Sequence, residues 1–139
     1  MTIRNVGEWI PVNKKIPTKV FFVNQIIDNH NGLEIKLISE EQDEILKICF
    51  EENVFEYCSI EESCDISRLN MLEKKYGNDF FTNNKILYRV EESEFIKRFC
   101  EKSGGVTDES EVLHFAIITS DYFIDIASNN EPIVSYMYI

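Results

Sequence analysis

Hydrophobic and polar positions alternate along the first half of the chain with the period of two that half-buried strands show. Two such runs, 20–28 and 33–38, flank an Asn-Gly pair, which favours the positive φ angles of hairpin turns. Two more runs, 45–50 and 54–59, follow after short acidic breaks. Because antiparallel neighbours need no crossover, this order predicts a meander of four strands.

The period changes in the middle of the chain. Apolar residues recur every three or four positions across 66–76, Asp65 or Ser67 can cap the start of this segment, and a glycine follows its end. This spacing predicts a helix of about three turns. A second amphipathic run begins at Ser93 and ends before Gly104, which predicts a second helix.

The remaining β-rich runs cover 85–90, 112–119, 122–127 and 133–138. The whole pattern predicts a single α+β domain over residues 1–139, with a mainly antiparallel sheet of about seven strands and two helices packed on one face. A chain of 139 residues with 44% apolar residues is sufficient for one core.

Charge adds a bias to this picture. The chain carries 25 acidic and 14 basic residues, a net charge of −11. Residues 40–65 hold many carboxylates and Lys47 as their one base. Such a surface repels phosphate backbones and attracts basic proteins, so we expect a basic protein partner and no direct nucleic-acid binding. Since the chain shows no long apolar run and no secretory signal, we expect a cytoplasmic protein without membrane contact.

The acidic stretch has two explanations. Charges on an edge strand prevent it from pairing with other chains, and carboxylates around aromatic side chains form docking surfaces for basic partners. The candidate partner-binding residues are Glu40, Glu41, Asp43, Glu44, Glu51, Glu52, Phe55, Tyr57, Glu61, Glu62 and Asp65.

Motifs for cofactor chemistry are missing from the sequence. The one Gly-Gly pair follows a helix and lacks the lysine of a phosphate-binding loop, and no G-x-S-x-G or EF-hand spacing occurs. The four cysteines form no C-x-x-C pair, so we expect them to pack as small hydrophobic residues. We therefore expect no cofactor, no metal and a protein that is not an enzyme.

His114 is the strongest candidate for acid-base chemistry. It lies on a predicted strand. Asp121 lies at the start of the next predicted strand, and Asp125 lies within that strand. If these strands form a hairpin, His114 and Asp125 can approach each other. The alternative is a structural histidine with satisfied hydrogen bonds. We treat His114, Asp121 and Asp125 as a secondary candidate site.

The stretch 113–126, LHFAIITSDYFIDI, is similar to the aromatic-flanked strand, Thr-x-Asp turn and Ile-Asp-Ile strand of small proteins from Gram-positive toxin and immunity loci. A small acidic chain without a catalytic motif also resembles bacterial immunity proteins. The resemblance implies a cytoplasmic protein that neutralises a nuclease-type toxin with a basic active cleft.

Three functions remain open at this point. The first is an immunity protein against a basic toxin. The second is a phage or host inhibitor whose carboxylates mimic nucleic acid on a defence or replication enzyme. The third is a small-ligand binder or enzyme with a pocket between sheet and helices. A homodimer also remains open, since the strand-rich end 136–139 can pair with a second copy.

Overall fold

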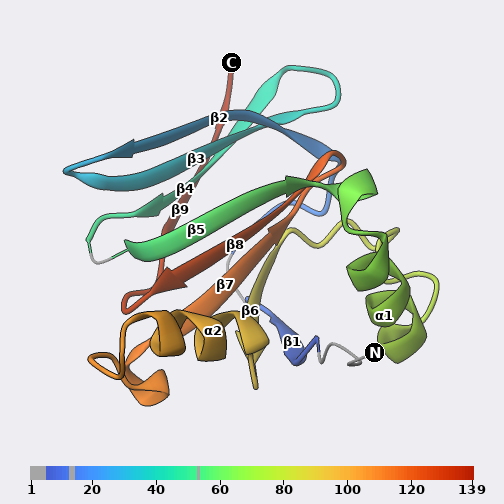
Figure 1. Cartoon of the computed structure of the whole chain (residues 1–139). Coiled ribbons are helices and arrows are strands. Elements are labelled where there is room, and N and C mark those ends of the chain that lie inside the picture. Colours follow the sequence, from blue (N-terminus) through green and yellow to red (C-terminus); the bar gives the residue numbers. More distant parts are fainter. Residues whose placement is uncertain (1–5, 13–14, 53) are drawn as a thin grey trace.

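The computed structural model describes residues 6–12, 15–52 and 54–139, and the following statements concern these residues. They form two antiparallel sheets and two α-helices (Figure 1). The first sheet has the order β2-β3-β4-β9, with bounds β2 (Phe21–Asn29), β3 (Gly32–Ser39), β4 (Glu44–Phe50) and β9 (Ile133–Tyr138). The second has the order β1-β6-β7-β8-β5, with bounds β1 (Glu8–Pro11), β6 (Leu87–Glu91), β7 (Leu113–Ile118), β8 (Tyr122–Ser128) and β5 (Val54–Glu61).

The five-stranded sheet is the middle of three layers (Figure 1). One of its faces packs on the four-stranded sheet through a core that includes Leu46, Phe115 and Ile124. The helices α1 (Ile66–Tyr76) and α2 (Glu94–Lys102) cover its other face. Leu72 of α1 and Ile96 of α2 are the buried residues of these helices. The predicted α+β class with two helices on one face is therefore confirmed.

Local signals set the ends of both helices. The Asp65 side chain accepts a hydrogen bond from the Arg68 backbone N–H and caps α1, which ends at Gly77 with a φ of 99°. Ser93 caps α2 by accepting from the Ile96 N–H at 3.1 Å. Short 3-10 helices at Glu62–Cys64 and Glu109–Glu111 precede α1 and β7.

The predicted four-strand meander is wrong at its last member. β2, β3 and β4 are neighbours, but β5 crosses to the other sheet and pairs with β8, and β9 takes the free edge of β4. Cys49 of β4 and Cys58 of β5 therefore lie in different sheets. Alternation shows that β5 has one buried face, but it does not say which sheet that face belongs to. The described residues form nine strands rather than about seven, and the short β1 was not predicted.

The hairpin between β2 and β3 depends on Gly32, whose φ is 124°. A Cβ atom at this position would lie 2.1 Å from the Phe50 carbonyl oxygen. Both the backbone angle and the close approach of β4 exclude larger residues. Among the helices of the described residues, none combines the length and apolarity needed to cross a membrane.

Candidate functional site

His114 and Asp125 lie on the helix-covered face of the five-stranded sheet. His114 pairs with Ala127 and Asp125 pairs with Ala116, so the two side chains are diagonal neighbours on adjacent strands. The distance from His114 Nε2 to Asp125 Oδ1 is 2.8 Å. Their exposed fractions are 5% and 3%. The β7–β8 hairpin thus brings together two residues that the sequence offered as a pair.

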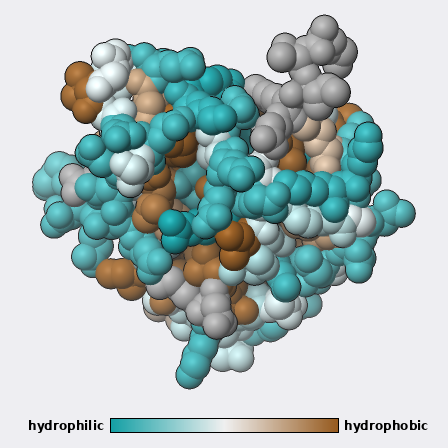
Figure 2. Space-filling view, turned by 90° about the horizontal axis from the view of Figure 1, so that it is seen from below, coloured by the Kyte–Doolittle hydropathy of each residue, from teal (hydrophilic) through white to brown (hydrophobic). Residues whose placement is uncertain are grey.

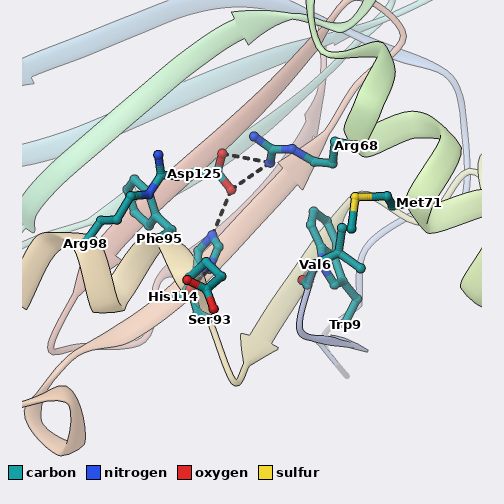
Figure 3. Close-up of a pocket in the computed structure, with 10 residues that line it drawn as sticks. Val6, Trp9, Arg68, Met71, Ser93, Phe95, Arg98, His114 and Asp125 are labelled. Atoms are coloured by element: carbon teal, nitrogen blue, oxygen red, sulfur yellow. Dashed lines mark hydrogen bonds and ion pairs between the residues drawn. The ribbon is translucent and has the colours of Figure 1, made fainter. Parts of the chain in front are cut away.

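The contact belongs to a longer buried network (Figure 3). Ser93 Oγ lies 2.7 Å from His114 Nδ1. Arg68 approaches both oxygens of Asp125 with Nη1, at 3.0 and 2.8 Å, and its Nε donates to Asp65 at 2.8 Å. The network therefore joins the first turns of α1 and α2 to two strands of the sheet.

Charge in the network is balanced by hydrogen bonding. Burial by itself would raise the pKa of Asp125, but the hydrogen bond from His114 and the charge of Arg68 outweigh it and hold that pKa below its ordinary value. Burial likewise opposes the charge of Arg68, yet Asp125 and Asp65 raise the Arg68 pKa. An ionised Asp125 accepts a proton donor, so His114 Nε2 carries the hydrogen.

The other imidazole nitrogen completes the pattern. The Ser93 hydroxyl oxygen already accepts the Ile96 N–H, and its hydrogen is free to be donated to Nδ1 of a neutral His114. Every polar atom along Ser93, His114 and Asp125 then has a partner. The residue order Ser-His-Asp is that of catalytic relays, but the two imidazole nitrogens are exchanged: in those relays serine contacts Nε2 and aspartate contacts Nδ1, whereas here Ser93 contacts Nδ1 and Asp125 contacts Nε2.

Two features distinguish the arrangement from a working relay. Ser93 is 8% exposed, and its oxygen holds the first turn of α2. The cavity beside it has a volume of about 60 Å³ and is bordered by Trp9, Phe95 and Arg98. A nucleophile needs open access to a substrate carbonyl. The geometry therefore favours a structural network that fixes both helices on the sheet.

A larger groove of about 610 Å³ adjoins this network between α1 and α2. Cys58 and Ile60 of β5 belong to its lining, and Arg98 of α2 also lines it. Figure 2 looks at the molecule from below the view of Figure 1 and shows hydrophobic side chains near the middle of a hydrophilic surface. Within the described residues Arg98 forms no ion pair.

The predicted partner-binding residues divide between two ends of the molecule. Glu40, Glu41 and Asp43 lie exposed in the turn between β3 and β4. Glu44 follows them, but it is 2% exposed and accepts from Lys19 Nζ at 2.6 Å with both oxygens. The hydrogen bond from Lys19 lowers the pKa of Glu44. Asp43 is exposed but accepts a hydrogen bond from Ser39 Oγ at 2.8 Å, so Glu40 and Glu41 are the more available carboxylates of this turn, and Glu44 is occupied.

Glu51 and Glu52 lie at the opposite end, after β4. A strand of seven residues separates them from the β3–β4 turn by about 20 Å. Phe55 is 42% exposed there and stacks on Phe99 of α2, with ring centroids 5.6 Å apart. A register irregularity in β5 between Val54 and Glu56 accompanies this position. This irregularity places Phe55 and Tyr57 on opposite faces of the sheet, since Tyr57 packs against the core between the two sheets.

The last acidic candidates lie where β5 leads into α1. Glu61 is exposed, and burial followed by the charge of Asp121 raises the pKa of Glu62. Asp65 is 8% exposed and belongs to the buried network. Asp121 accepts from Thr119 Oγ1 at 2.8 Å and from the Val23 N–H, so it organises the β7–β8 turn and does not join His114.

Sequence reasoning missed two members of the network. Ser93 was expected only as the start of the second helix, and Arg68 was not singled out. The available signal was an arginine three residues after the capping Asp65, together with a histidine and an aspartate on strands predicted to be buried. Only the packing of α1 over β8 shows that Arg68 and His114 share Asp125 as their partner.

The comparisons with protein families, curated proteins and solved structures found no match. No group of three or more His, Cys, Asp or Glu side chains suited to a metal ion occurs in 6–12, 15–52 and 54–139.

Proposed function

We propose that this chain is an acidic binding protein that neutralises a basic protein partner, as an immunity protein does for a nuclease-type toxin. One observation carries the proposal. Seven of the 25 acidic residues form ion pairs with a described lysine or arginine, and the other 18 form none with these cations. Unpaired surface carboxylates attract a basic partner and speed its association.

The contact surface in this proposal is the end of the molecule with Glu51, Glu52 and Phe55. Phe55 is a large exposed side chain held in place by Phe99, so little conformational freedom is lost when a partner covers it. Aromatic side chains of this kind contribute most of the affinity in many interfaces, while surrounding charges steer the encounter. The β3–β4 turn carries charge without such an anchor and contributes mainly to the long-range field.

The first experiment is to retain proteins from a lysate of the source organism on this chain at low and high salt. A single basic protein that is retained at low salt and released at high salt provides the partner for quantitative work. Association is then measured at nanomolar concentrations with Phe55→Ala and with Glu51→Gln/Glu52→Gln. The matched control is Glu40→Gln/Glu41→Gln, which removes the same charge at the other end.

Phe55→Ala is expected to weaken binding by about 30-fold, mostly through faster dissociation. Glu51→Gln/Glu52→Gln is expected to slow association and flatten its salt dependence more than the control does. The proposal fails if no basic protein is retained. The choice of surface fails if Phe55→Ala leaves the affinity unchanged or if the control pair has the larger effect.

A second candidate function is a small-ligand binder or enzyme that uses the pocket between sheet and helices. The hydrogen-bonded order Ser93, His114, Asp125 favours it. Labelling with a serine-directed fluorophosphonate separates the two candidates. Modification at Ser93 that is lost in His114→Gln supports an enzyme, whereas an unreactive Ser93 agrees with a structural network.

A further inference from the structure

The outer face of the four-stranded sheet carries a row of apolar side chains. The strand register places Phe22 beside Ile38, Ile38 beside Ile45, and Ile45 beside Met137. Met137 is 47% exposed and the other three are half-buried. The described helices lie on the far side of the five-stranded sheet and leave this face open (Figure 1). An apolar row across four strands is typical of an interaction surface.

Opposite charges flank this row on its two sides. On one side of the row, two residues further along the strands, Lys36 lies directly opposite Lys47. Like charges in such cross-strand pairs are destabilising, and Glu34 offers each of them only a distant oxygen at 4.0 Å. Toward the other end, the exposed turn residues Glu40 and Asp43 follow the row. Asp43 accepts a hydrogen bond from Ser39 Oγ at 2.8 Å, and neither carboxylate forms an ion pair with a described cation.

We propose that two copies of this chain pack these faces together about a two-fold axis that runs along the apolar row. Such a rotation reverses the strand direction and places the row of one copy on the row of the other. The lysines and the turn carboxylates each lie two residues, about 7 Å, from the axis. Each lysine pair therefore faces Glu40 and Asp43 of the second copy, and the contact is self-complementary.

The size of the surface sets the strength of the dimer. Four strands about 4.8 Å apart and about 20 Å of strand length give roughly 400 Å² per copy. This is about half of the 800 Å² per partner in a standard stable interface. The dimer is therefore weak and reversible, with dissociation in the micromolar range or above. It uses a different face from the surface around Phe55, so the two proposals stand or fall separately.

Sedimentation equilibrium from about 1 to 500 µM measures the association, a range chosen to bracket a micromolar Kd. The wild-type chain is expected to show a reversible monomer–dimer equilibrium. Met137→Lys places a charge in the apolar row and is expected to weaken the dimer at least about tenfold. The matched control is Ile133→Lys, since Ile133 lies on the same strand and face, is 52% exposed, and is four residues from the row. It is expected to leave dimerisation unchanged.

A charge exchange tests the proposed orientation. Lys36→Glu/Lys47→Glu is expected to weaken the dimer about tenfold, and so is Glu40→Lys/Asp43→Lys. Combining all four substitutions restores opposite charges across the axis and is expected to return the affinity to within a few-fold of wild type. Circular dichroism confirms that each variant is folded. The proposal is overturned by a monomeric wild type, by equal effects of Met137→Lys and Ile133→Lys, or by a combined variant no better than its parents.

Discussion

Replacement of Arg68 by methionine tests the structural role of the buried network. The Arg68 side chain is 18% exposed and the Asp125 side chain 5%. Without the guanidinium, Asp125 keeps the hydrogen bond from His114 but loses the contacts of both its oxygens with Arg68 Nη1, at 3.0 and 2.8 Å. Removal of one partner from a buried ion pair costs about 3 to 5 kcal/mol, because the remaining charge stays buried.

This loss is large relative to the stability of a domain, which is about 5 to 15 kcal/mol. It can be measured by urea unfolding, with Trp9 as the fluorescent probe because Trp9 is 6% exposed and packs on Tyr88. Arg68→Met is expected to lower the unfolding free energy by about 3 kcal/mol or more with an unchanged urea dependence.

The matched control is Lys97→Met on α2. The Lys97 side chain is 50% exposed and lies 3.6 Å from Glu94, so its removal is expected to cost less than about 0.5 kcal/mol. The double variant Arg68→Met/Asp125→Asn is expected to lose less unfolding free energy than the two single variants lose together, because the neutral amide no longer needs the cation. Equal stability of Arg68→Met and Lys97→Met would refute the reasoning.

Three further predictions follow from the same structure. The pKa of folded Asp125 is lowered, so the stability that its ionised form contributes is complete above the unfolded pKa of about 4 and is lost as the pH falls through the folded pKa. The unfolding free energies of wild type and Asp125→Asn, measured from pH 7 to pH 3, should therefore converge. Gly32→Ala is expected to cost about 2 kcal/mol or more in urea unfolding, since the new Cβ meets the Phe50 carbonyl oxygen, and a neutral result would contradict the turn geometry. Ser93→Ala removes the cap of α2 and the hydrogen bond to His114, so a loss of about 2 kcal/mol is expected, while Ser93→Thr should retain part of it.

Much of the secondary structure was predictable because it depends on neighbouring residues. The Asn-Gly turn, the cap at Asp65 and the three- and four-residue spacing in α1 all act over a few positions. The hairpin that joins His114 to Asp125 belongs to the same class, since a short turn connects their strands. These features follow from backbone geometry, side-chain periodicity and local hydrogen bonding, which the sequence displays directly.

Partners distant in the sequence were decided by tertiary structure. A half-buried strand has the same alternation in either sheet, so the pattern could not show that β5 joins β8 and leaves β4 to β9. A strict period of two also predicts that Phe55 and Tyr57 share one face of β5, and the irregularity that places them on opposite faces was not visible in the pattern.

The same distinction applies to the candidate site and to the acidic residues. Composition alone determined that the chain carries a large surplus of carboxylates. Packing decided that Asp65 and Asp125 share Arg68, that Glu44 pairs with Lys19, and that most other carboxylates form no ion pair with a lysine or arginine of the described residues. The reason is physical: the number of charges belongs to the sequence, whereas burial and pairing depend on which distant elements the hydrophobic core brings together.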